Sequence, residues 1–302
     1  PIRSQLIMDY LKRFSLLFLS LTTLVVVSCS NESSDSSKPA NGEKDESYTE
    51  AMAEEHKDDK PVPNAAFDEP DQPVTAKDVT YGQVDGQLIT GYFARPEAQE
   101  ENLPSIIVIH EWWGLNENIR MMTRKLAGLG YAALAVDLYN NKVAENADDA
   151  RTYMQQAMGH KKKALNNLND AYTYLQRTQG EVKTGVIGWC FGGAWSLNAA
   201  LAMPQKLDAC NIYYGRLVTD ATELKKIEMP ILGIFGAEDR GIPPKKVRRF
   251  ESVLDSLGKE ADIHIYDGAG HAFANPSGTK YNEQAAADAW QKTVAFFEKN
   301  LK

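Results

Sequence analysis

The chain has 302 residues, of which 43% are hydrophobic and 25% charged, a composition that suits one large globular domain with appended segments. The formal net charge is −8, yet residues 30–75 alone carry thirteen acidic residues against four lysines. Once this acidic stretch and the basic residues 1–29 are set aside, residues 76–302 are almost neutral. This balance excludes a basic footprint for nucleic acid.

Residues 8–29 are typical of an export signal. Met8 is the expected start, two basic residues follow, and an apolar run covers 14–27. That run is shorter than the roughly 20 residues of a membrane span. It ends at Cys29 in a pattern that resembles the lipobox of bacterial lipoproteins. We therefore expect a signal peptide over 1–28, with the residues before Met8 lying upstream of the true start, and a lipid on Cys29. The alternative is an ordinary signal peptide in which this cysteine is incidental.

The next segment, residues 29–75, combines the lipid-bearing Cys29 with a stretch rich in Ser, Asp, Glu, Lys and Pro. Such a stretch has too few large apolar groups to offset the entropy lost on ordering. We expect a disordered acidic linker that joins the lipid to a domain over 76–302. The expected location is the bacterial cell envelope, at the periplasmic face or the outer membrane. A disulfide between Cys190 and Cys210 is an alternative in an oxidising compartment.

The domain is predicted to alternate strands with helices after an initial hairpin. The runs 79–84 and 87–93 flank Asp85-Gly86, a strong two-residue hairpin signal. A β-branched run then predicts a buried strand over 105–110, and Asn116 can cap a helix that ends near residue 129. Further strands are predicted over 131–136, 183–188, 209–214, 230–236 and 263–266, and helices over about 148–178, 193–202, 245–257 and 283–300. The pattern indicates an α/β fold with a mostly parallel twisted sheet, helices on both faces and an N-terminal antiparallel hairpin.

The sequence Gly188-Trp189-Cys190-Phe191-Gly192-Gly193 lies between a predicted strand and a predicted helix. In the Gly-x-Ser-x-Gly turn of α/β-hydrolases, small neighbours allow a strained turn that presents the nucleophile. Here Cys190 holds that position. A dinucleotide-binding reading fails, because this cysteine stands where the second glycine of that fingerprint is needed. The five histidines and three cysteines show no metal-ligand spacing, so we expect no metal and no cofactor.

Four candidate site residues follow predicted strands, where ligands bind in open α/β sheets: Glu111, Cys190, Asp239 and His271. Nucleophile, acid and histidine come in the chain order that α/β-hydrolases use. Glu238 is a competing acid beside Asp239. His110, at the end of a buried strand, has a structural role or forms part of a pocket wall.

Residues 76–302 resemble the dienelactone hydrolase family. The likeness is carried by four blocks of sequence: 107–114, 130–139, 188–193 and 270–273. The resemblance implies a Cys190, Asp239 and His271 triad, and it gives Glu111 a part in taking the thiol proton when substrate arrives. The backbone N–H groups of Phe191 and Trp112 are the expected oxyanion donors.

The resemblance also has a departure that concerns the substrate. Family members that cleave dienelactone hold its carboxylate with arginines, one of them four residues after the histidine, where this chain has Asn275. Arg151, Arg216 or Arg240 are possible substitutes. The candidate substrate-binding residues are Trp113, Tyr139, Arg151, Phe273 and Asn275.

The leading hypothesis is an exported, lipid-anchored and monomeric cysteine hydrolase of small esters or lactones that forms an acyl-enzyme. The alternative is a non-catalytic surface lipoprotein that uses the hydrolase scaffold for binding. A thiol redox protein is a third reading, but the chain has no Cys-x-x-Cys pair.

Overall fold

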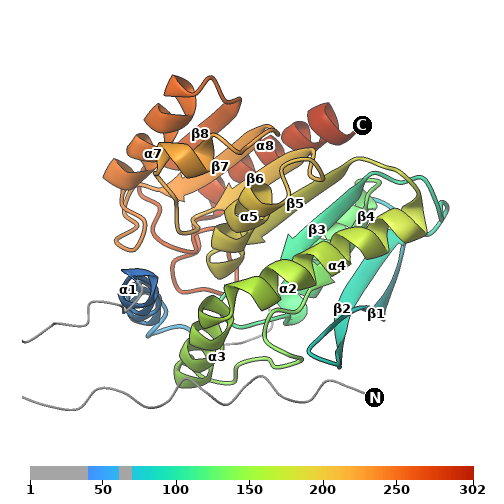
Figure 1. Ribbon diagram of the computed structural model, residues 1–302, viewed down its shortest axis with the longest axis horizontal. Coiled ribbons are helices and arrows are strands. Elements are labelled where there is room, and N and C mark those ends of the chain that lie inside the picture. The colour runs from blue at the N-terminus through green and yellow to red at the C-terminus, as the bar shows by residue number, and fades with distance from the viewer. Residues whose placement is uncertain (1–39, 61–69) are drawn as a thin grey trace, which may run out of the picture. The chain divides into compact units, whose positions relative to one another are not determined.

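The computed structural model describes residues 40–60 and 70–302. Within these residues, eight strands form one sheet in the order β1-β2-β4-β3-β5-β6-β7-β8 (Figure 1). The strands are β1 Val74–Val84, β2 Gln87–Pro96, β3 Ser105–Ile109, β4 Ala132–Val136, β5 Thr184–Trp189, β6 Ala209–Tyr213, β7 Ile231–Gly236 and β8 Ala261–Tyr266. The strands from β4 through β3 to β8 pair in parallel, whereas β2 is antiparallel to both β1 and β4. The predicted α/β fold with a mostly parallel sheet is confirmed.

The N-terminal hairpin is also confirmed. Asp85 and Gly86 both have positive φ, 51° and 82°, which is the backbone of the tight turns that match the twist of paired strands. The hairpin strands extend several residues beyond the predicted runs, because β1 begins at Val74 and β2 ends at Pro96.

The helices agree with the predicted alternation, with one division. The predicted helix over 148–178 is two helices, because His160 leaves the helical conformation with φ −117° and ψ 46°. The predicted cap is present: the Asn116 side chain accepts a hydrogen bond from the Ile119 N–H. The helices are α1 Ala40–Glu55, α2 Glu117–Gly128, α3 Ala147–Gly159, α4 Lys161–Gln179, α5 Phe191–Ala202, α6 Ala221–Leu224, α7 Pro244–Ser256 and α8 Glu283–Leu301.

The central strands β3 to β7 form the core of the domain. Every residue of β3, β4, β5, β6 and β7 is buried, as expected for parallel strands covered on both faces. Helix α4 crosses the sheet over β3 and β4, and α5 packs beside it over β5 and β6 (Figure 1). Because parallel strands end at a common edge, the loops after β3, β5, β7 and β8 lie together there.

The N-terminal part of the domain differs from the linker expected over residues 29–75. Residues 40–55 form α1, and its side chains Tyr48 and Met52, with His56 just beyond, are buried. Residues four apart lie on one helical face, so these three side chains form a single stripe against the domain. Cys29 and the predicted signal peptide lie outside the described residues. In the described part of the chain, no helix has both the length and the apolar character to cross a bilayer.

Candidate active site

The turn between β5 and α5 places Cys190 in a strained conformation. Its φ of 55° and ψ of −114° lie in a region that side-chain-bearing residues rarely adopt. The turn also requires its glycines, because a Cβ on Gly188 would lie 2.3 Å from the Gly192 backbone, and one on Gly192 would lie 2.3 Å from the Ile109 carbonyl oxygen. The strand thus ends in a sharp turn that directs the thiol away from the sheet.

Three buried side chains from three different loops form a hydrogen-bonded chain. The Cys190 Sγ lies 3.1 Å from the His271 Nε2, and the His271 Nδ1 lies 2.8 Å from an Asp239 carboxylate oxygen. The other oxygen of Asp239 accepts from the Ile242 N–H at 2.8 Å. Glu238, the competing acid in the sequence, is exposed. The arrangement is that of a nucleophile, a base and an orienting carboxylate.

The thiol and the imidazole favour a thiolate–imidazolium pair. Burial raises the pKa of Cys190, but the charges and hydrogen bonds of His271 and, to a smaller extent, His56 outweigh it and bring this pKa to about 6. Burial lowers the pKa of His271, whereas the charges of Asp239 and Cys190 raise it well above its ordinary value. The proton of the pair therefore belongs on the imidazole near neutral pH. Cys210 is also a free, buried cysteine, but burial alone raises its pKa, so it stays a thiol. The alternative disulfide between the two is not formed.

Glu111 lies in the same cluster, but it is held by an amide. The Asn275 Nδ2 donates to a Glu111 carboxylate oxygen at 2.8 Å, and no hydrogen bond joins Glu111 to Cys190 among the described residues. Burial and the nearby Cys190 charge raise the pKa of Glu111 to about 8. Asn275, where the resemblance implies an arginine, thus contacts a neutral carboxyl group inside the site.

His110 has a structural position beneath the site. Its Nδ1–H donates to the Glu111 carbonyl oxygen at 2.8 Å, and its Nε2 accepts from the Leu138 N–H at 3.1 Å. Burial lowers its pKa to about 4. The ring stacks on Phe191, so a neutral His110 ties the loops after β3 and β4 to the start of α5.

The two predicted oxyanion donors are available. Neither the Phe191 N–H nor the Trp112 N–H donates a hydrogen bond to any other described residue. Phe191 is the first residue of α5, where backbone N–H groups have no partner within the helix. Such N–H groups at a helix N-terminus favour a developing negative charge.

The predicted substrate-binding residues lie in different surroundings. Phe273 is fully buried between Tyr214 and Tyr266, and Trp113 is buried against Trp112. Arg151 pairs with Glu50 of α1 at 3.2 Å. In this structure, the arginine is engaged with α1.

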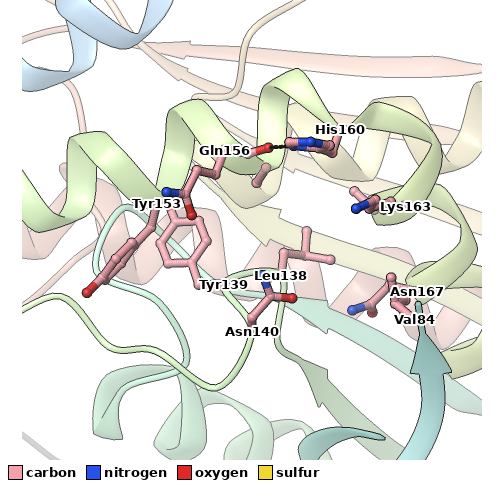
Figure 2. Close-up of a pocket in the computed structure, with 11 residues that line it drawn as sticks. Val84, Leu138, Tyr139, Asn140, Tyr153, Gln156, His160, Lys163 and Asn167 are labelled. Atoms are coloured by element: carbon pink, nitrogen blue, oxygen red, sulfur yellow. Dashed lines mark hydrogen bonds between the residues drawn. The ribbon is translucent and has the colours of Figure 1, made fainter. Parts of the chain in front are cut away.

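Tyr139 lines a pocket whose walls do not include the thiol. Figure 2 shows this pocket between the loop after β4 and helices α3 and α4, with Tyr139, Tyr153, His160 and Asn167 on its walls. Cys190, Asp239 and His271 do not contribute to it. The Tyr139 ring contacts His110 and Phe191, so Tyr139 connects the pocket with the packing beneath the catalytic turn.

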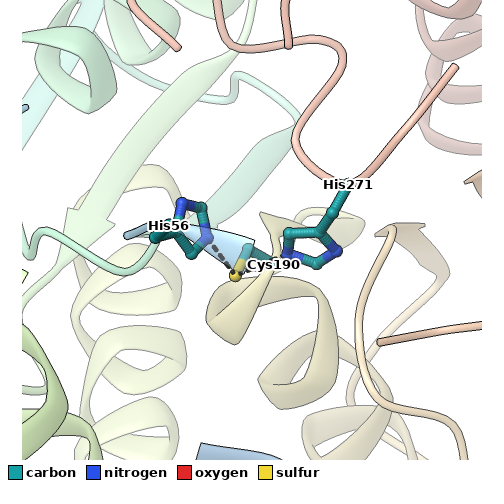
Figure 3. A group of neighbouring side chains, drawn as sticks. All are labelled: His56, Cys190 and His271. Atoms are coloured by element: carbon teal, nitrogen blue, oxygen red, sulfur yellow. Dashed lines mark hydrogen bonds between the residues drawn. The ribbon is translucent and has the colours of Figure 1, made fainter. Parts of the chain in front are cut away.

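The thiol is covered by the N-terminal segment, residues 48–59. The His56 Nε2 lies 3.5 Å from the Cys190 Sγ, and the His56 ring contacts the His271 ring with centroids 5.3 Å apart (Figure 3). The Met52 sulfur lies 3.8 Å from the same Sγ. The His56 ring also stacks on Trp112 with centroids 5.4 Å apart. Under this cover the exposed fraction of Cys190 is 0%.

Polar contacts anchor the N-terminal segment on both sides of His56. The His56 Nδ1 lies 2.8 Å from one Asp59 carboxylate oxygen, and the other oxygen accepts from the N–H and hydroxyl of Thr279 at 3.0 and 2.6 Å. The Lys280 ammonium donates to the Glu55 carbonyl oxygen at 2.8 Å and pairs with its carboxylate. Burial raises the pKa of Asp59, but the hydrogen bonds from His56 and Thr279 lower it to about 2. Asp59 is therefore ionised beside His56.

The sequence prediction missed His56, Met52 and Asp59. The available signal was the four-residue spacing of Tyr48, Met52 and His56 within a charged stretch, which is the spacing of one helical face. The high charge of the stretch favoured disorder. Among residues 47–55 of this short helix, the charged side chains lie mainly on its exposed face. Charged residues dominate the average composition, which therefore gave no sign of the few apolar residues on the buried face.

Comparison with known proteins gives a consistent result. A sequence profile described as "Dienelactone hydrolase family" matches residues 89–301. The chain is 32% identical over 223 residues to "Protein usf" of Aquifex pyrophilus, covering 72% of this chain and 95% of that protein. It is also 32% identical over 259 residues to a "Putative carboxymethylenebutenolidase" of Saccharolobus solfataricus, covering 74% and 98%. A solved structure described as a "Putative Dienelactone Hydrolase" from Klebsiella pneumoniae superposes with a TM-score of 0.67 at 27% identity, covering 76% of this chain and all of that one.

Proposed function

Because the chain belongs to the dienelactone hydrolase family, we propose that it hydrolyses small esters or lactones through a covalent acyl-enzyme on Cys190. The observation that carries the proposal is the chain of contacts from the Cys190 Sγ through His271 to Asp239, at 3.1 and 2.8 Å. These contacts join an activated nucleophile, a base and an orienting carboxylate at the end of a strained turn.

In the first half-reaction, the Cys190 thiolate attacks the ester carbonyl carbon. The carbonyl oxygen becomes an oxyanion that the Phe191 and Trp112 N–H groups bind. As the intermediate collapses, the protonated His271 Nε2 gives its proton to the leaving alkoxide, and a thioester remains on Cys190. In a lactone the leaving oxygen stays attached to the acyl group.

In the second half-reaction, water hydrolyses the thioester. The neutral His271 takes a proton from the water, and the resulting hydroxide attacks the thioester carbonyl in the same oxyanion site. Collapse releases the carboxylic acid and restores the thiolate–imidazolium pair. The neutral Glu111 beside Cys190 adds no second negative charge to the pocket, which favours formation of the oxyanion.

Substrate entry requires the N-terminal segment to move. The His56 ring covers Trp112, whose N–H is one of the two oxyanion donors, and the Met52 sulfur contacts the nucleophile. An ester carbon cannot approach a sulfur that has no exposed surface. The structure corresponds to a closed state, and hydrolysis proceeds from an open one.

The test is hydrolysis of a panel of aryl esters, lactones and thioesters by the full chain. We expect turnover by the wild type, and a loss of at least about 10³-fold in Cys190→Ala and in His271→Ala. Cys210→Ser is the matched control, because its thiol is buried outside the cluster. Turnover that survives Cys190→Ala would rule out the thiol mechanism. An absence of turnover across the panel, also in a variant with a loosened N-terminal segment, would favour the non-catalytic scaffold.

We further propose that the protein is lipid-anchored in the bacterial cell envelope through Cys29. The support is the basic, apolar and small-residue-then-cysteine order of residues 8–29. Metabolic labelling with a radioactive fatty acid tests this. The proposal predicts label on the wild-type chain and none on Cys29→Ser. Equal labelling of both would refute it.

A further inference from the structure

Two imidazole–carboxylate pairs converge on the Cys190 sulfur, and their rings contact each other edge to face with centroids 5.3 Å apart. His271, oriented by Asp239, places its Nε2 3.1 Å from the Sγ, and His56, oriented by Asp59, places its Nε2 3.5 Å away (Figure 3). Hydrolysis by the mechanism above uses one such pair. The second, supplied by a segment far away in the sequence, has no part in that chemistry.

We propose that Cys190, His271 and His56 form a zinc-binding site that holds the N-terminal segment closed over the thiol. The thiolate Sγ and the two Nε2 atoms are the ligands. Cysteine and histidine are the donors that Zn²⁺ prefers in proteins. Water or a small anion completes the fourth position.

The distances fit this assignment. The three donor atoms lie within 4.8 Å of one another. A tetrahedral zinc ion, with bonds of about 2.3 Å to sulfur and about 2.0 Å to nitrogen, separates sulfur from nitrogen by about 3.5 Å and nitrogen from nitrogen by about 3.3 Å. The two sulfur–nitrogen distances, 3.1 and 3.5 Å, are close to the first value. The two nitrogens, which lie within 4.8 Å of each other, would move together as the ion enters.

The carboxylates behind the two rings provide a second, independent argument. A histidine that binds a metal usually donates its other ring N–H to a carboxylate, which fixes the ring and raises its basicity. Asp239 and Asp59 both take this place, each at 2.8 Å from an Nδ1. Asp59 is in turn held by Thr279. Both pairs thus have the same arrangement: an imidazole faces the sulfur, a carboxylate holds its Nδ1, and a further hydrogen bond holds the carboxylate.

The charge of the cluster also favours a cation. All three ligands are buried. A thiolate and two carboxylates share this small volume with the protonated His271, whose positive charge is lost when a metal displaces its proton. A divalent ion would offset part of that negative charge in a site that excludes solvent. Binding displaces the proton shared by Cys190 and His271, which passes to solvent.

The consequence is a metal-dependent closed state. Zinc would occupy the lone pairs of the nucleophile and of the base, and His56 would tie the N-terminal segment to both. The hydrolase would then be inactive and its thiol protected while metal is bound. The site lies in the proposed catalytic centre, but the binding of metal to it does not depend on turnover.

Cobalt(II) titration of the full chain in a Cys29→Ser background tests the proposal without any substrate. We expect one equivalent of Co²⁺ to give a thiolate-to-cobalt charge-transfer band with tetrahedral visible absorption, both bleached by Zn²⁺. Cys190→Ser should abolish the charge-transfer band. His56→Gln should weaken affinity at least about 100-fold, and Asp59→Asn about 10- to 100-fold. Cys210→Ser and His160→Gln are matched controls that should bind as the parent does.

The cobalt affinities of the variants decide whether the N-terminal segment contributes to the site. Loss of affinity in His56→Gln and Asp59→Asn, with unchanged controls, supports the site. Parent affinity in both variants would show that metal is held without the N-terminal segment and would overturn the proposal, as would the absence of a thiolate band in the parent. Failure of the hydrolase proposal would appear only in the ester panel, because the cobalt spectrum is read in the absence of substrate.

Discussion

The two sides of the Cys190 thiol are built in different ways. On one side, His271 and Asp239 follow β8 and β7, strands of an eight-stranded sheet whose central members are buried. On the other side, His56 follows one helix, α1, which packs on α3 outside the sheet and is also held by Met52, Asp59 and the Glu55–Lys280 contact. Elements at the periphery of a domain open at a lower free energy than its core. We therefore expect the side formed by His271 and Asp239, here called the catalytic half after the proposed function, to be rigid, and the N-terminal segment, here called the cover, to open while the domain stays folded.

The largest effect on hydrolysis is expected from a change at Asp239, in the catalytic half. Asp239→Asn keeps the size of the side chain but removes the charge that orients and stabilises the His271 imidazolium. We expect kcat for an aryl ester to fall by about 10⁴-fold, the loss found when a triad acid becomes an amide. Steady-state kinetics give kcat and KM for the variant. Glu238→Gln, a change at the neighbouring exposed residue, is the control. A loss of less than about tenfold would remove Asp239 from the triad.

The interaction of the Cys190 thiol with His271 can be measured from the pH at which the thiolate forms. The pKa of Cys190 is brought to about 6, because His271 and, to a smaller extent, His56 outweigh the effect of burial. The thiolate therefore forms as pH rises through about 6 and is lost below it. In His271→Ala the His56 imidazole still lowers the Cys190 pKa, but the larger effect of His271 is lost and burial remains. The midpoint should therefore rise from about 6 toward the ordinary thiol value of about 8.5. At pH 7 the thiolate fraction should then fall by at least about tenfold.

Thiolate ultraviolet absorbance against pH, with Cys190→Ala subtracted, gives the two midpoints. The subtraction removes Cys29 and Cys210 from the titration. Equal midpoints in wild type and His271→Ala would show that His271 does not lower the pKa of Cys190.

The cover is tested at Met52. Met52→Ala removes a fully buried side chain that contacts the Cys190 sulfur, and such a deletion costs about 2 kcal/mol or more. The segment should open more often, and we expect an uncharged alkylating reagent to modify Cys190 at least about tenfold faster. Mass spectrometry of the Cys190 peptide follows the rate. Lys57→Ala, an exposed change in the same segment, is the control. An unchanged rate in Met52→Ala would mean that the cover does not limit access.

The smallest effect is expected at Asn275, which joins Glu111 to the site. Asn275→Ala removes the 2.8 Å hydrogen bond to the Glu111 carboxyl group. A lost hydrogen bond inside a buried site costs about 1 to 2 kcal/mol, so kcat/KM should fall about tenfold. Asn300→Ala, on α8, is the control. If ester kinetics are unchanged, the Glu111–Asn275 contact has no part in catalysis.

The meeting of Cys190, Asp239 and His271 could be predicted from the sequence, because each of them follows a strand that the pattern identifies. The carboxyl ends of parallel strands lie at one edge of the sheet. The sequence therefore places the end of the β-branched strand, the glycine-flanked Cys190 and the later histidine at that edge. The cover could not be predicted in the same way. His56 and Cys190 are distant in the chain, and no local spacing reports that they meet. The division at His160 was missed as well, because the helical pattern continues on both sides of it.

The meeting of His56, Cys190 and His271 could not be predicted from residue spacing either. A cluster built from one segment leaves a pattern of close intervals, whereas these three side chains come from separate parts of the fold. Only the tertiary structure brings them together. The same holds for Asn275, whose contact with Glu111 joins the loops after β8 and β3.

The central claim is that Cys190 carries the acyl group during hydrolysis. The most direct measurement is intact-mass and peptide mass spectrometry of the full chain, quenched with acid during turnover of an activated aryl ester. The account predicts an acyl adduct on the Cys190 peptide, absent in Cys190→Ala and accumulating when His271 is replaced by a residue that cannot activate water. Turnover with no adduct on Cys190, or with the adduct on another side chain, would contradict it.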